Sequence, residues 1–85
     1  MKEEPSPFAL LIDYVERDGL AADAKQLSTL LRDVAWTTGS EFLGEFGLRI
    51  KELKKTQWHR MSPKTRASFR SAARAIMKGW PDIGL

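Results

Sequence analysis

The chain has 85 residues, of which 42% are hydrophobic and 29% are charged, and it contains no cysteine. This length corresponds to a single domain, residues 1–85, and the missing cysteines exclude disulfides and thiolate metal sites. The formal net charge of +3 is too small to indicate a partner by itself. The longest apolar run, FALLI, is far shorter than a membrane span, so we expect no membrane partner and a cytoplasmic location.

Charges are distributed unevenly along the chain. Residues 1–48 contain four lysines or arginines and nine aspartates or glutamates, a balance of −5, whereas residues 49–85 contain ten and two, a balance of +8. A local field, rather than the net charge, attracts a charged partner. The basic second half is therefore the first place to look for a binding surface.

In the first half, two helices are predicted on either side of Gly19. Ser6 and Pro7 combine an N-cap with a proline at the first helical position, and apolar residues then recur at helical spacing. Glycine is the typical residue at the end of a helix. We therefore expect helices over residues 6–18 and 20–37, with residues 1–5 forming a flexible N-terminus.

A third helix is predicted over residues 40–58. The sequence TTGS interrupts the helical pattern before it, and either Thr38 or Ser40 can cap the new helix, although helices two and three could also form one kinked rod. Gly44 and Gly47 weaken this helix by roughly 1 kcal/mol each relative to alanine. A close approach of a neighbouring helix would explain why both glycines are present.

The fourth helix is predicted over residues 62–79, because Ser62 and Pro63 repeat the capping device of the first. Its apolar positions, together with Trp80, are expected to be buried. No stretch alternates between apolar and polar residues as a half-buried strand would. The prediction is therefore an all-α fold, a compact bundle of about four short helices.

The fourth helix also carries a positive stripe, in which cations recur every four residues and so share one helix face. The stripe consists of Arg66, Arg70, Arg74 and Lys78. Four further cations that could extend this surface are Lys51, Lys54, Lys55 and Arg60. Because arginine binds phosphate in a bidentate geometry, the basic half 49–78 predicts a sequence-nonspecific nucleic-acid-binding module. Trp58 would stack on an unpaired base if its ring is exposed.

Two other interpretations of the stripe stay open. The acidic first half could neutralise the basic second half within the bundle, which would leave the stripe as ordinary solvated surface. Alternatively, the stripe could face an acidic surface of a protein partner, where charge steers association and sets specificity.

Several large apolar residues fall outside the predicted core faces. They are Leu10, Tyr14, Trp36, Leu48 and Trp58. Tryptophan and tyrosine dominate the energetics of protein interfaces, so these positions favour a protein partner, and they would also allow a homodimer. The alternative is that a small bundle uses nearly every helix face for its own core.

No catalytic constellation is recognisable. The one histidine, His59, has no partner at metal-ligand spacing, and Glu41 with Glu45 forms an ordinary surface pair. We therefore expect neither an enzyme nor a cofactor or metal. The favoured prediction is a small helical adaptor or inhibitor that binds a larger protein, such as a nucleic-acid-handling machine, and the nucleic-acid-binding module is the alternative.

Overall fold

The structure is a computed structural model that describes residues 6–34, 36 and 38–85. The described residues form four α-helices, α1 (Pro7–Arg17), α2 (Ala21–Ser28), α3 (Gly39–Gln57) and α4 (Pro63–Gly79), and no strand. Three short helical turns join or extend them, a π-helical turn η1 (Thr29–Asp33) and two 3-10 turns, η2 (Trp58–Arg60) and η3 (Pro81–Ile83). The predicted all-α bundle is confirmed.

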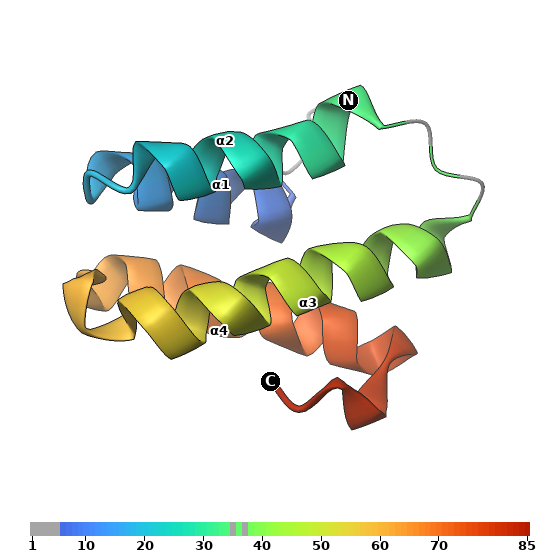
Figure 1. Cartoon of the computed structure of the whole chain (residues 1–85). Helices are drawn as coiled ribbons and strands as arrows, with labels where there is room; N and C mark the ends of the chain where they lie inside the picture. The colour runs from blue at the N-terminus through green and yellow to red at the C-terminus, as the bar shows by residue number, and fades with distance from the viewer. Residues whose placement is uncertain (1–5, 35, 37) are drawn as a thin grey trace, which may run out of the picture.

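The helices are arranged as two stacked pairs. Figure 1 shows α1 beside α2 in one layer and α3 beside α4 in the other, and α1 packs directly on α4. After α4 the chain turns back, so that the segment from Trp80 to Leu85 lies alongside α3 (Figure 1). No helix in the described part of the chain is long and apolar enough to cross a membrane.

The core lies between the two layers and is formed by the predicted apolar faces. Leu11, Val15, Ile50 and Ile76 have no exposed surface at all. Phe46 is equally buried, and its ring packs against the rings of Phe8 and Phe42 with centroids 5.1 and 5.3 Å apart. Burying each of these large apolar side chains contributes about 1.5–3 kcal/mol, and this packing holds the two layers together.

Three of the helices start directly after a residue whose side chain caps them. The hydroxyls of Ser6, Thr38 and Ser62 accept hydrogen bonds from backbone N–H groups in the first turns of α1, α3 and α4, at 3.0, 3.1 and 3.3 Å. Of the two candidate caps for α3, the structure therefore selects Thr38. Gly19 ends α1 with a φ of +85°, a left-handed conformation that favours glycine. These four signals act through neighbours within a few residues, which is why they are readable in the sequence.

The break between α2 and α3 is wider than predicted. The helix expected over residues 20–37 ends at Asp33, and Val34 has an extended conformation (φ −95°, ψ 130°). Because the helix has ended, Val34 leaves the apolar face that was predicted for it and is 38% exposed. The alternative of one kinked rod through helices two and three is wrong. The predicted flexible N-terminus, residues 1–5, lies outside the described residues.

The end of α1 is joined to the start of α4 by a polar contact. The Asp18 carboxylate accepts a hydrogen bond from the Ser62 backbone N–H at 2.8 Å. Burial acts to raise the pKa of Asp18, but hydrogen bonds from the Thr65 hydroxyl and from the backbone and hydroxyl of Ser62 prevail, so the pKa is lowered. Thr65 is itself fully buried. This contact sets where α4 starts relative to α1.

Candidate binding surfaces

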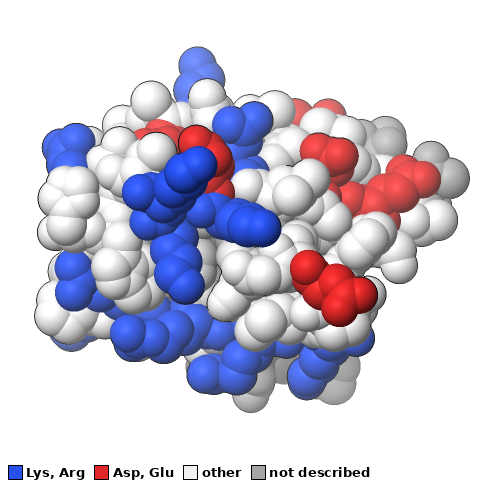
Figure 2. Space-filling model, turned by 60° about the horizontal axis from the view of Figure 1, so that its bottom comes forward, with Lys and Arg blue, Asp and Glu red and all other residues white. Residues whose placement is uncertain are grey.

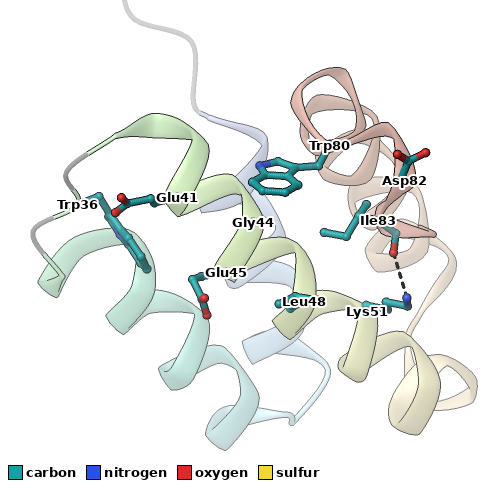
Figure 3. A pocket seen from close by; sticks show the side chains of 9 residues that line it. All are labelled: Trp36, Glu41, Gly44, Glu45, Leu48, Lys51, Trp80, Asp82 and Ile83. Atoms are coloured by element: carbon teal, nitrogen blue, oxygen red, sulfur yellow. Dashed lines mark hydrogen bonds between the residues drawn. The ribbon is translucent and has the colours of Figure 1, made fainter.

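An open groove of about 670 Å³ runs along the outward side of α3 (Figure 3). One wall is Trp36, which precedes α3, and the other is the segment that follows α4. The lining residues are Trp36, Glu41, Gly44, Glu45, Leu48, Lys51, Trp80, Asp82 and Ile83. We call this surface the acidic-rimmed groove.

Two glycines of α3 allow the C-terminal segment to lie this close. A Cβ atom at Gly44 would lie 3.3 Å from two atoms of the Trp80 ring, and one at Gly47 would overlap the end of the Ile83 side chain. The close neighbour of the glycines is thus mainly the segment after α4, with Ile76 of α4 also near Gly47. The sequence predicted that a neighbouring helix approaches both glycines closely. A helix, α4, does approach Gly47 through Ile76, but the other close contacts come from the segment after α4.

Hydrogen bonds fix this wall in place. The Trp80 indole N–H donates to the Ser40 carbonyl at 2.9 Å, and the Lys51 ammonium donates to the Ile83 carbonyl at 3.0 Å (Figure 3). The prediction that Trp80 is buried in the core is wrong, because α4 ends at Gly79 and Trp80 turns out of its helical path, with φ −136° and ψ 69°. Its ring is 43% exposed and contributes an aromatic surface to the groove.

Trp36 forms the opposite wall as a fixed, half-buried side chain. Its indole N–H donates to the Leu30 carbonyl at 2.7 Å, and its ring lies edge-on to Phe42 with centroids 5.9 Å apart. Between the two walls, Leu48 is 56% exposed, more than any other large hydrophobic side chain in the described part of the chain. The groove therefore presents apolar surface that no described segment covers.

The rim of the groove is acidic. Glu41, Glu45 and Asp82 are exposed around the apolar floor. Lys51, the single cation of the lining, is engaged with the Ile83 carbonyl. The lining residues thus carry a charge of −2, three acids and one lysine, although the whole chain carries +3.

A second hollow, of about 510 Å³, lies between α3 and α4 and has a basic rim. Its lining residues are Lys54, Trp58, Phe69, Arg70, Ala73, Arg74, Met77 and Leu85. We call this surface the basic hollow. In Figure 2, lysine and arginine side chains spread over much of the face shown, and aspartate and glutamate gather mostly toward its right side. The charge polarity predicted from the sequence thus persists in space.

The predicted basic residues differ in exposure, and some of the exposed ones also donate hydrogen bonds. Arg66 is engaged, because its guanidinium donates two hydrogen bonds to the Trp58 carbonyl, at 3.1 and 2.9 Å. The exposed members are Arg70, Arg74, Lys78, Lys54, Lys55 and Arg60. Lys51 is also exposed but contacts the C-terminal segment, as described above.

The predicted apolar residues do not form one surface. Trp36 and Leu48 meet in the acidic-rimmed groove, and Trp58 is half-buried against Phe69 in the basic hollow. Leu10 and Tyr14 lie elsewhere, in a shallow hollow between α1 and α4. The sequence did not identify Trp80, Ile83 or the acidic rim as parts of a site, and the glycine pair of α3 was the signal that pointed toward them.

Within the described part of the chain, lysine and arginine side chains donate their hydrogen bonds to uncharged acceptors. Every hydrogen bond that a described lysine or arginine side chain donates goes to a hydroxyl, a carbonyl or an amide oxygen, and not to a carboxylate. The alternative that the acidic first half compensates the basic second half as solvated surface stays a prediction.

Among residues 6–34, 36 and 38–85, no three histidine, aspartate or glutamate side chains are close enough together to hold a metal ion. His59 is exposed in η2. Comparisons with protein-family models, with curated proteins and with solved structures gave no match.

Proposed function

We propose that the protein is a small non-enzymatic adaptor or inhibitor that binds a larger protein through the acidic-rimmed groove. The observation that carries this proposal is the exposed apolar floor at Leu48 between two fixed tryptophan walls. Partly exposed tryptophan rings that are already held in place lose little entropy on binding, so they suit an interface.

The charges of the groove favour a basic amphipathic segment as its occupant. An apolar side chain of such a segment would cover Leu48, while lysine or arginine would face the rim formed by Glu41, Glu45 and Asp82. The tryptophan faces add to this preference, since cations are attracted to aromatic rings. An amphipathic helix in a groove is a common mode of peptide recognition.

The test uses a labelled helical peptide of leucine and lysine and a matched peptide with glutamate in place of lysine. We expect the lysine peptide to bind at least about tenfold more tightly, because each unfavourable rim contact costs a few tenths to 1 kcal/mol. Leu48→Asp should abolish binding of the lysine peptide. Leu10→Asp is the matched control, since Leu10 is 40% exposed but lies outside the groove.

Capture of a natural partner from the source cell uses the same variants. A protein that is retained by the wild type and by Leu10→Asp, and lost with Leu48→Asp, would support the groove. Loss of the captured protein with Leu10→Asp alone would contradict binding through the groove and would place the interface at the hollow between α1 and α4. Sedimentation of the protein alone tests a second copy as occupant, and dimerisation abolished by Leu48→Asp would replace the larger partner with a homodimer.

A further inference from the structure

We propose that the basic hollow is a separate binding site for the phosphate backbone of nucleic acid. This inference does not rest on the groove, because the two surfaces share no lining residue. It follows from how the structure holds the cations around Trp58 and from the absence of acids among the residues that line the hollow.

Three cations from two helices surround the Trp58 ring. The Lys54 Nζ and the Cζ atoms of Arg66 and Arg70 lie 5.7, 5.3 and 5.5 Å from the ring centroid, within the range of cation–π contacts. Arg66 is also tied to the Trp58 carbonyl and therefore acts as a support for the ring. Lys54 and Arg70 are exposed, so a ligand in solvent can reach them.

The side chains that line the hollow include three cations, Lys54, Arg70 and Arg74, and no carboxylate. No aspartate or glutamate is among the lining residues, and Arg74, which adjoins Arg70 one turn along α4, donates only to the Ser71 hydroxyl among the described residues. Like charges at this spacing repel each other by a few tenths of a kcal/mol. A bound anion would remove that repulsion, and the ring contacts keep part of the cluster ordered before binding.

The spacing of the cations favours a nucleic-acid strand over an acidic protein surface. Arg70, Arg74 and Lys78 recur every four residues of α4, an interval of about 6 Å along the helix axis. A regular row of cations suits a ligand whose charges also recur regularly, as the phosphates of a strand do. Arginine adds bidentate donors that match phosphate oxygens.

The structure argues against a stacking role for Trp58. The ring is half-buried, Phe69 lies edge-on to it at 5.4 Å, and Lys54, Arg66 and Arg70 occupy its surroundings. Binding through the hollow would therefore use phosphates alone, so duplex DNA, single-stranded DNA and RNA should all bind without regard to sequence.

The experiment is fluorescence anisotropy with labelled oligonucleotides of these three kinds, titrated at about 50 mM and 200 mM salt. We expect micromolar binding at the lower salt. The slope of log affinity against log salt should be about −3 to −4, as Lys54, Arg70, Arg74 and Lys78 would each neutralise about one phosphate. Arg70→Glu with Arg74→Glu should weaken binding by at least about tenfold and reduce the size of the slope by about 2.

A matched control distinguishes an effect of the basic hollow on binding from an effect of the protein's net charge. Lys25→Glu on α2 with Arg32→Glu on η1 changes the charge by the same amount, and both side chains are exposed. This control should retain affinity within about twofold of the wild type, because neither Lys25 nor Arg32 lines the hollow. The milder pair Arg70→Gln with Arg74→Gln repeats the test if the glutamate pair is poorly folded by circular dichroism.

Three outcomes would overturn the proposal. They are no binding by the wild type at the lower salt, equal weakening by the Lys25 and Arg32 control, and tighter binding of an acidic peptide of the same charge than of any oligonucleotide. The last outcome would assign the hollow to an acidic protein. Failure of this proposal is distinguishable from failure of the proposed function at the acidic-rimmed groove, because the Arg70 and Arg74 variants should bind the lysine peptide as the wild type does.

Discussion

Replacing Asp18 by alanine is expected to destabilise the fold by about 2 kcal/mol at neutral pH. The carboxylate accepts the Ser62 backbone N–H at 2.8 Å, and a hydrogen bond to a charged group contributes about 1.5–3 kcal/mol. It also places a negative charge at the N-terminal end of α4, where the helix dipole favours it. For a domain of this size the melting temperature should fall by about 8–16 °C.

The pH dependence of this effect has a definite sign. Hydrogen bonds from Thr65 and Ser62 outweigh burial and lower the pKa of Asp18 from its ordinary value of 3.8, so the unfolded chain binds this proton more tightly than the native state. The contribution of Asp18 to stability is therefore fully present above pH 3.8 and is lost as the pH falls through the lowered native pKa. The deficit of Asp18→Ala should shrink over the same range.

Thermal unfolding followed by circular dichroism, at neutral pH and at several values below pH 3.8, measures both effects. Asp13→Ala is the matched control, because Asp13 is an exposed carboxylate on the same helix and should change stability by less than about 0.5 kcal/mol. A deficit of Asp18→Ala that is the same at neutral and acidic pH would refute the role of the charge. A deficit no larger than that of Asp13→Ala would refute the contact itself.

Three further changes test the fold and the groove. Thr38→Ala removes the cap of α3 and should cost about 1 kcal/mol in chemical unfolding, whereas an unchanged midpoint would contradict the capping bond to Glu41. Ile50→Val, at a fully buried position, should cost about 0.5–1.5 kcal/mol, and a smaller cost would indicate a loosely packed core. Gly44→Val should push the Trp80 ring off α3 and increase its quenching by acrylamide in a protein whose other tryptophans are phenylalanine. Unchanged quenching, with Gly44→Ser as the milder comparison, would mean that the ring does not rest on this glycine.

Much of the fold was predictable because its signals are local. The cap-then-proline pairs at Ser6 and Ser62 and the glycine at position 19 act on backbone groups within a few residues. The helical recurrence of apolar side chains identified most of the buried core in the same way. The predicted end of the second helix, at residue 37, was less accurate. The helix ends at Asp33, although the apolar periodicity continues through Val34.

For the candidate sites, the sequence determined which charged and apolar residues are available, and the tertiary structure decided which of them meet in one surface. Charge polarity and the apolar residues outside the core faces were visible in the chain itself. The sequence did not show whether a given side chain forms a hydrogen bond, because its partner is distant in sequence or depends on how a turn folds back. Arg66 bonds to the Trp58 carbonyl across the turn that joins α3 to α4, and Trp36 returns to the Leu30 carbonyl.

Contacts between residues that are far apart in the sequence show the physical reason most clearly. Asp18 and Ser62 are 44 positions apart, and Trp80 reaches the Ser40 carbonyl across 40 positions. Each contact exists only because apolar faces have already packed the helices into a particular arrangement. Side-chain periodicity specifies those faces, but the distances and angles between packed helices depend on how their side chains interdigitate. The sequence alone therefore determined most of the residues that form helices and core, and only the packing decided that a tryptophan expected in the core would line a groove.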